Sequence, residues 1–142
     1  SECFGRDIYH NGRLNRGLLS SRVFGESDKI VLLNSIVHPV VRFDFYRWSE
    51  SLNEEICFVE SAILYESRFD ELVDEVWTVT APEELRIGRV RQRSGLTEEE
   101  IKKRMAAQLS EEEKQRRAAH IIWNDGNVSV IHRVLSLLKS LE

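Results

Sequence analysis

The pattern of apolar and polar positions divides the chain into a helical first third and an alternating remainder. Residues 13–24 repeat apolar side chains at the spacing of an amphipathic helix, so we predict a helix there. A second helix is predicted to begin at Ser27 or Asp28. Because proline disfavours a helical residue before it, the pair His38–Pro39 should break or kink this helix, and residues 40–49 should continue as another.

Aromatic side chains surround the end of this helical region, at Phe43, Phe45, Tyr46 and Trp48. They fall on almost every side of a helix, so at least some of them must face another element or a groove. Packing in the core is the expectation for most of them.

Three short apolar segments follow, at residues 55–60, 75–80 and 119–123. They are rich in β-branched and aromatic residues and are separated by helical stretches, which predicts an α/β fold with a parallel sheet and crossover helices. Cys57 lies within the first segment and is expected to be buried and reduced. Ligands bind at the carboxyl ends of strands in such sheets, so Glu60, Glu66 and Thr80 become candidate site residues.

Helix starts are well marked between the second and third segments. Pro82 suits the first turn of a helix that runs to about Arg93. Thr97 with Glu100, and Ser110 with Glu113, both have the spacing of a capping box, which predicts two further short helices.

Basic residues gather on these helices. Residues 85–117 contain half of the chain's 20 lysines and arginines, and the planar fork of arginine suits phosphate oxygens. Glutamates in the same stretch balance much of this charge, so an ordinary solvated helix face is the competing interpretation.

Composition narrows the class of protein. A chain of 142 residues with 42% hydrophobic and 31% charged residues is enough for one domain with a core. The net charge of −4 argues against nonspecific binding to nucleic acid or membranes. We find neither a membrane-spanning run nor a signal peptide and expect a cytoplasmic protein. Met105 is the only methionine, so we expect the chain to be a piece of a longer protein.

Five sequence blocks, in this order, resemble those of the dephospho-coenzyme A kinase family. They are Leu33-Asn-Ser-Ile-Val-His-Pro39, Glu60-Ser-Ala-Ile-Leu-Tyr-Glu66, Gly95-Leu-Thr-Glu-Glu-Glu100, Arg104-Met-Ala-Ala-Gln-Leu109 with Glu112-Glu-Lys114, and Ile122-Trp-Asn-Asp-Gly126. The resemblance covers essentially the whole chain. It implies ATP-dependent phosphorylation of the ribose 3′-hydroxyl of dephospho-coenzyme A, the last step of coenzyme A synthesis, with Mg²⁺.

The implied fold is a P-loop kinase-like, three-layer parallel sheet with a helical lid and a helical substrate-binding insertion. The chain departs from it by lacking a Walker A loop, G-x-x-x-x-G-K-[S/T], because none of its lysines follows a glycine. We therefore expect the first strand, the P-loop and the catalytic aspartate, which would bind most of the ATP and Mg²⁺, to lie before Ser1. Glu60 occupies a position where the family often has aspartate, which weakens its assignment as a residue near the metal. His120 occupies a second position where the family often has aspartate.

The resemblance assigns roles to individual residues. Arg104 and Gln108, one turn apart on one helix face, would be catalytic lid residues that approach the ATP phosphates. The nucleotide-binding candidates are Arg93, Asn124 and Gly126, and the substrate-binding candidates are His38, Arg42 and Glu66.

We expect one domain over residues 1–142. It would comprise a substrate-binding region at about 13–51, a core at about 55–84 and 118–142, and a lid at about 85–117. The missing strand would lie between the strands ending near Glu60 and Thr80, and unpaired edges there are costly. These two strands should therefore pair directly, or accept a strand from a second copy in a swapped dimer, or be ordered only beside the missing part.

Two alternatives remain open. One is another nucleoside or nucleotide kinase of the same fold, against which the His-Pro and Ala-Ala-Gln-Leu blocks argue. The other is a noncatalytic, arginine-rich binding module that meets RNA or a partner protein. Such a module usually has a strong net positive charge, which this chain does not have.

Overall fold

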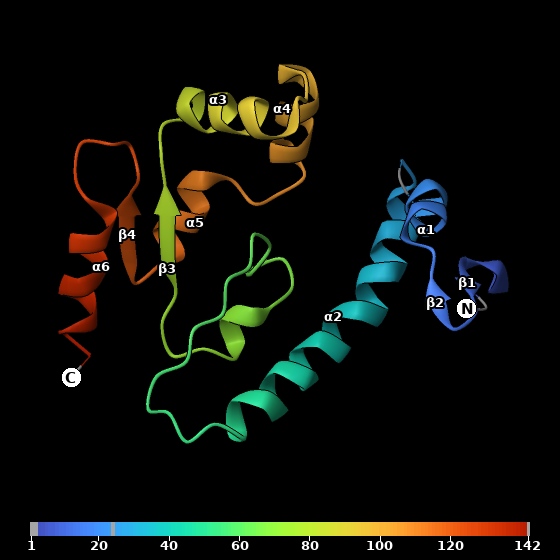
Figure 1. Cartoon of the computed structure of the whole chain (residues 1–142), viewed down its shortest axis with the longest axis horizontal. Helices are drawn as coiled ribbons and strands as arrows, with labels where there is room; N and C mark the ends of the chain where they lie inside the picture. The colour runs from blue at the N-terminus through green and yellow to red at the C-terminus, as the bar shows by residue number, and fades with distance from the viewer. Residues whose placement is uncertain (1–2, 24, 142) are drawn as a thin grey trace. The chain divides into compact units, whose positions relative to one another are not determined.

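The computed structural model describes residues 3–23 and 25–141, which fall into two compact units, residues 1–57 and 58–142 (Figure 1). The first unit contains a 3₁₀ turn at Arg6–Ile8, strands β1 (Tyr9–His10) and β2 (Arg13–Leu14), and helices α1 (Arg16–Val23) and α2 (Ser27–Glu50). The second contains a 3₁₀ turn at Phe69–Glu71, strands β3 (Trp77–Thr80) and β4 (His120–Trp123), and helices α3 (Glu83–Ser94), α4 (Glu98–Ala106), α5 (Glu111–Arg117) and α6 (Val130–Leu138). The expected single domain stays a prediction.

A small hairpin precedes α1, and the sequence prediction missed it. Asn11 and Gly12 both have positive φ, 49° and 74°, which is the backbone of a two-residue turn between antiparallel β1 and β2. Residues 13 and 14 therefore belong to β2, and α1 begins only at Arg16. The Asn-Gly pair was a readable signal for this turn.

The core of the first unit lies under α1. Phe4, Ile8 and Val23 are buried together, and Leu18, Leu19 and Leu33 pack against them. Arg22 closes this cluster, since its guanidinium pairs with the carboxylate of Asp7 and also donates to the carbonyl of Phe4 over 2.6 Å.

Helix α2 is continuous from Ser27 to Glu50, so the predicted break at Pro39 is wrong. Proline removes one backbone donor from the helix, and residues on both sides continue the hydrogen-bond ladder. The cap is also different, because Glu26 is the N-cap residue rather than Ser27 or Asp28. No side chain of α2 is buried, and Phe43 and Trp48 are 62% and 48% exposed, so the expected core packing of the aromatic residues is wrong.

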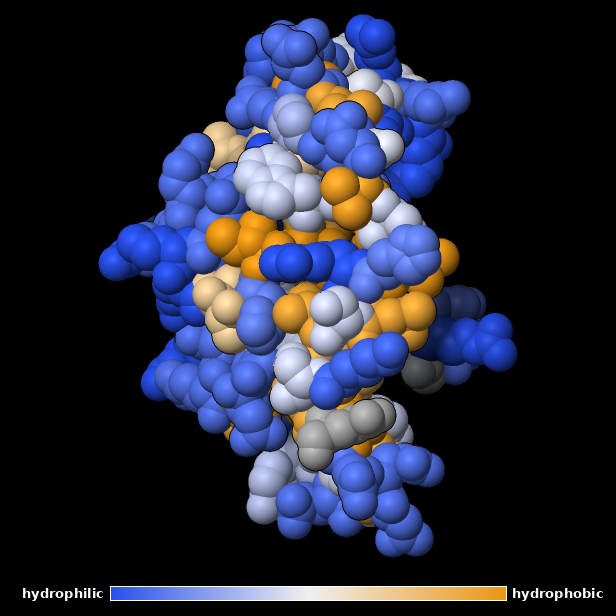
Figure 2. All heavy atoms as spheres, turned by 90° about the vertical axis from the view of Figure 1, so that its left-hand side faces the viewer, coloured by the Kyte–Doolittle hydropathy of each residue, from blue (hydrophilic) through white to orange (hydrophobic). Residues whose placement is uncertain are grey.

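Strands β3 and β4 of the second unit pair in parallel, with Trp77 opposite His120 and Thr80 opposite Trp123. Their connection runs through α3, α4 and α5, which confirms the α/β prediction with crossover helices. Helix α5 packs on β3 and α6 packs on β4. Figure 2 faces the side of the molecule where α6 lies, and apolar side chains reach the surface there among hydrophilic ones.

Residues 55–60 form no strand, contrary to the sequence prediction. Within the described residues β3 pairs only with β4, and Phe58 reaches β3 through its ring, which lies edge-on to Trp77 at 6.0 Å. A strand requires a backbone partner, and this segment finds none. The predicted direct pairing of residues 55–60 with β3 is therefore wrong. Cys57 is exposed rather than buried. The swapped dimer and the dependence on a further polypeptide both need a second chain and stay predictions.

The loop before β3 is anchored to the end of α5. The guanidinium of Arg117 lies 4.1 Å from the ring centre of Tyr65 and donates to Asp70 over 2.6 Å. Tyr65 and Phe69 are buried beneath it. The other buried hydrophobic residues of the second unit are Ala81, Ile87, Ile101, Ile122 and Leu137. This core fixes the carboxyl ends of β3 and β4, where the candidate site lies.

None of the helices in the described part of the chain is both long enough and apolar enough to cross a membrane.

Candidate functional site

A pocket of about 420 Å³ opens between the helices that follow β3 and the first turns of α5. Its walls come from α3, α4, α5 and the segment between α4 and α5. The lining residues are Glu83, Arg86, Lys102, Met105, Ala106, Gln108, Leu109, Ser110, Glu111, Glu112 and Lys114. The pocket therefore lies within the predicted lid region, at its junction with the sheet.

The capping predictions explain how the chain builds these walls. Thr97 and Glu100 form the complete reciprocal capping box at the start of α4, as predicted. Ser110 accepts a hydrogen bond from the backbone N–H of Glu113 over 3.2 Å and so begins α5. The second half of that box does not form, because the Glu113 carboxylate binds Arg116 instead. Helix α3 runs from Glu83 to Ser94, close to the predicted bounds, but Pro82 is its N-cap rather than a residue of its first turn.

Thr80 connects the sheet to α5. Its side chain is at the last position of β3 and only 3% of the residue is exposed. The hydroxyl donates to Glu111 Oε2 over 2.9 Å and accepts from the side-chain amide of Gln115 at 3.4 Å. The candidate chosen from its strand end thus lies beside the pocket.

Glu111 also meets two cations. Its Oε1 lies 3.2 Å from Arg86 Nη1 on α3 and 3.5 Å from Lys114 Nζ, one turn further along α5. The three side chains are only 14% to 26% exposed, so these ion pairs are less screened than surface pairs. Arg86 is fixed further by its Nε–H, which donates to the carbonyl of Ala81 over 3.0 Å.

Gln108 lies beside Lys114, whose Nζ donates to the amide oxygen of Gln108 over 3.2 Å. The expectation that Arg104 and Gln108 share one helix face is wrong, because α4 ends at Ala106. The chain must leave the helix there to reach the extended backbone of Ser110, the N-cap of α5. Glu66 helps to hold this segment, since its Oε1 accepts from the backbone N–H of Leu109 over 2.7 Å.

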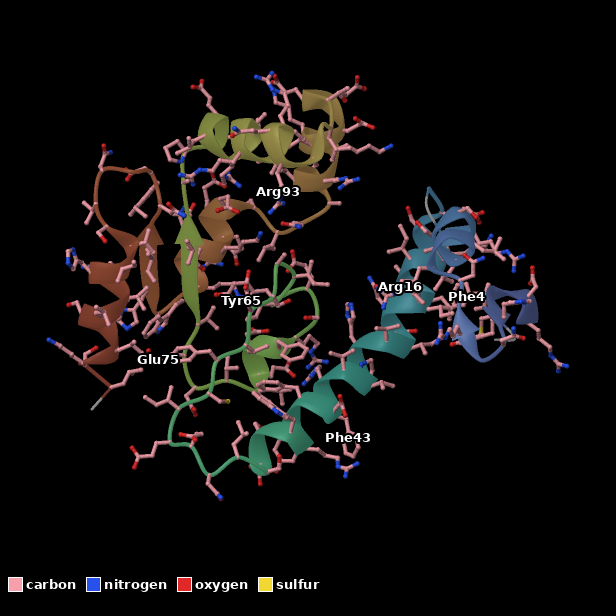
Figure 3. The ribbon with its side chains drawn as sticks, in the orientation of Figure 1. Phe4, Arg16, Phe43, Tyr65, Glu75 and Arg93 are labelled. Carbon is pink, nitrogen blue, oxygen red and sulfur yellow. The ribbon has the colours of Figure 1, made fainter. Side chains whose placement is uncertain are left out.

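The two predicted lid arginines lie outside the pocket lining. Arg104 is exposed on α4, and Arg93 is exposed in the last turn of α3 (Figure 3). Both guanidinium groups are on the predicted lid, and neither lines the pocket.

Asn124 and Gly126 lie in the turn after β4. The backbone N–H of Asn124 donates to the Thr80 carbonyl over 2.7 Å, and its own carbonyl accepts from Arg89 Nη1 over 2.8 Å. Gly126 has a φ of 91°, which by itself accounts for a glycine there. The side chain of the following residue, Asn127, and its backbone N–H both bind the Asp125 carboxylate, which holds the pKa of Asp125 below its ordinary value.

His38 and Arg42 lie one turn apart on α2 in the first unit, and both are half-buried. Glu60 is exposed in the segment without strand pairing. No group of three histidine, cysteine, aspartate or glutamate side chains in the described part of the chain could hold a metal ion. Glu60 by itself would offer Mg²⁺ a single carboxylate.

Of the candidates predicted from the sequence, Gln108 lines the pocket, and Thr80 and Glu66 each contact a residue that lines it. Sequence reasoning included Arg86 and Lys114 only in a group of cations. It missed Glu111, although the spacing of Glu111 and Lys114 after a predicted N-cap was a usable signal. Chemically, the pocket offers guanidinium, ammonium and amide N–H groups, which suit phosphate oxygens. Three carboxylates, Glu83, Glu111 and Glu112, also line it, and Glu111 is the one that pairs with Arg86 and Lys114.

Comparisons with known proteins show the family of the chain. The family model described as dephospho-CoA kinase matches residues 1–129. The dephospho-CoA kinase of Bacteroides fragilis is 38% identical over 141 residues, which are 99% of this chain and 69% of that protein. That of Porphyromonas gingivalis is 33% identical over 138 residues, 96% of this chain and 68% of that protein.

Two solved structures resemble the chain in fold. The crystal structure of TT1252 from Thermus thermophilus superposes with a TM-score of 0.83 and 32% identity, covering 98% of this chain and 72% of that one. Dephospho-CoA kinase from Campylobacter jejuni has a TM-score of 0.67 at 24% identity, covering 99% of this chain and 75% of that one, and supports the fold alone.

Proposed function

The chain belongs to the dephospho-CoA kinase family, and we propose that its second unit supplies the lid that closes over ATP during phosphorylation of the ribose 3′-hydroxyl of dephospho-CoA. The observation that supports this most strongly is the pocket at the carboxyl end of β3. There Gln108, an expected lid residue, lies beside Lys114, and Arg86 is close by.

Phosphoryl transfer depends mainly on positioning and on stabilising charge that is spread over phosphate oxygens. In this proposal Gln108 contributes amide donors, and Arg104 brings its exposed guanidinium to the phosphates when the lid closes. Arg93 is a further phosphate contact. The turn with Asn124 and Gly126 would lie beside the adenine of ATP. Dephospho-CoA would be bound by His38, Arg42 and Glu66.

The described residues include no group of side chains that could hold the Mg²⁺ that accompanies ATP in such reactions. The proposal therefore contains no step that depends on Mg²⁺. We also propose that this 142-residue chain, which has no Walker A loop, shows no turnover by itself. Measurable phosphorylation by the purified chain would contradict that part of the proposal.

The test uses the complete gene product that contains this chain. It is assayed with ATP and, in turn, with dephospho-CoA, adenosine and nucleoside monophosphates. Turnover restricted to dephospho-CoA is expected, whereas preference for a monophosphate would favour another kinase of the same fold. Absence of turnover with every acceptor would leave the arginine-rich binding module as the better interpretation.

The lid assignment is tested in the same assay by replacing Arg104 with alanine. The kcat should fall by roughly a hundredfold or more, the effect of losing one preorganised charge-stabilising donor. Lys103→Ala is the matched control, because Lys103 is the adjacent exposed cation on α4. Equal values of kcat for the two variants would remove Arg104 from the site.

A further inference from the structure

One carboxylate joins three elements at the base of the lid. Glu111, the first residue of α5, accepts a hydrogen bond from Thr80 at the end of β3 and pairs with Arg86 on α3. Arg86 lies where the chain enters the lid. The second cation on the same carboxylate, Lys114, lies beside Gln108 in the segment that connects α4 to α5.

Lys114 fixes which way the Gln108 amide points. An ammonium group can only donate hydrogen bonds, so the Gln108 oxygen must face Lys114, as it does at 3.2 Å. The NH₂ group of the amide is then turned away from Lys114, and its two N–H groups are donors suited to an anionic oxygen. In the opposite orientation, the NH₂ group of Gln108 would face the ammonium group of Lys114, and its N–H groups would no longer be available to an anionic oxygen.

Glu111 in turn keeps Lys114 in place. Lys114 and Arg86 both reach the same carboxylate oxygen, so without that charge two cations would face each other in a partly buried site. The flexible lysine would then be expected to turn toward solvent, and the Gln108 oxygen would lose its donor.

We infer that Glu111 and Lys114 are positioning residues for Gln108, which hold its amide with the N–H groups free to meet phosphate oxygens when the lid closes. This inference rests on the proposed function. It adds two residues that do not themselves need to touch ATP.

The first test is independent of kinase activity and uses the complete gene product without ATP. NMR relaxation follows the side-chain NH₂ group of Gln108, because the backbone N–H groups of Gln108 and Leu109 donate to Met105 and Glu66 and do not report on this side chain. The order parameter of the NH₂ group should fall below about 0.6, the range of a flexible group, in Glu111→Gln and Lys114→Met. Glu113→Gln removes an ion pair from the same helix, away from the pocket, and should leave this order parameter unchanged.

The second test measures kcat and the KM for ATP in the complete gene product. If Glu111 acts through Gln108, Glu111→Gln should lower kcat about tenfold with a smaller change in KM, and should add little further loss to Gln108→Ala. Glu111→Asp should recover part of the activity. Independent, multiplying effects of the two substitutions would overturn the inference.

The two tests separate the possible failures. An unchanged order parameter of the Gln108 NH₂ group in Glu111→Gln and Lys114→Met would refute the positioning role whatever the protein catalyses. A lowered order parameter in these variants of a gene product without turnover would support the role of Glu111 and Lys114 in holding Gln108 and would refute the proposed kinase function.

Discussion

The hydroxyl of Thr80 donates a 2.9 Å hydrogen bond to the carboxylate of Glu111, so the last residue of β3 is joined directly to the first residue of α5. The two residues are 31 positions apart in the sequence, and most of the predicted lid, from residue 85 to residue 110, lies between them. This hydrogen bond joins the strand that precedes the predicted lid to the last helix of the lid.

Replacing Thr80 with valine should therefore destabilise the second unit. Valine keeps the shape but removes the hydrogen bond to Oε2 of Glu111, which should cost about 1 to 3 kcal/mol of unfolding free energy. The cost is measured by hydrogen exchange of the β3 and β4 amides. Thr78→Val is the matched control, because the Thr78 hydroxyl lies on the same strand and reaches the Lys114 carbonyl only at the long distance of 3.5 Å. An equal loss in both variants would assign the effect to strand packing.

Ile122→Ala should be one of the most damaging single substitutions in the second unit. Ile122 is 1% exposed at the centre of β4, and truncating such a residue costs about 2 to 5 kcal/mol. Ile131→Ala on α6 is the control, since Ile131 is 70% exposed and should lose less than about 1 kcal/mol. The same exchange measurement applies, and similar losses would show that Ile131 is covered in solution.

Tyr65→Phe should be neutral or stabilising. Among the described residues, the buried phenol oxygen of Tyr65 has no hydrogen-bond partner, so removing it eliminates an unpaired polar group. Urea unfolding at about pH 7 measures the difference, with Tyr46→Phe on the exposed part of α2 as the control. A loss of more than about 1 kcal/mol in Tyr65→Phe would mean that the hydroxyl is hydrogen-bonded in solution.

The same tyrosine should make the second unit sensitive to alkali. Burial raises the pKa of the Tyr65 phenol, while the nearby Arg117 guanidinium lowers it. As the pH rises above the unfolded pKa of about 10, the unfolded chain loses its proton first, so stability falls. Tyr65→Phe should lack this part of the loss when unfolding is repeated at about pH 10.5. Identical pH profiles for the two proteins would contradict the raised pKa.

Helix α4 should lose its N-terminal cap in acid. The backbone N–H and hydroxyl of Thr97 both donate to Glu100 and hold the pKa of its carboxyl below the ordinary value. Stability from this contact is complete above the unfolded pKa of about 4.3 and is lost as the pH falls through the lower folded pKa. An NMR titration of the Glu100 carboxyl carbon measures the shift directly. The exposed neighbour Glu99 provides the comparison in the variant Glu99→Gln, which should leave the titration of Glu100 unchanged.

Local sequence determined the elements whose stabilising contacts span only a few residues. The cap at Thr97, the helix α3 near Pro82 and the two paired strands were all predicted, because capping bonds and side-chain periodicity depend on residues within one or two turns of each other. The hairpin at Asn11 and Gly12 was equally local and could have been predicted from that dipeptide.

The tertiary structure decided whatever depends on a partner distant in the sequence. Residues 55–60 have the composition of a strand, but a strand forms only when another backbone accepts its hydrogen bonds, and none does here. The contacts of Glu111 also depend on tertiary structure, because Thr80 on β3 and Arg86 on α3 reach its carboxylate from other elements. The residue types and the family blocks were readable in the sequence, whereas the arrangement that brings a carboxylate, two cations and an amide together arises only from packing α3 and α5 beside the end of β3.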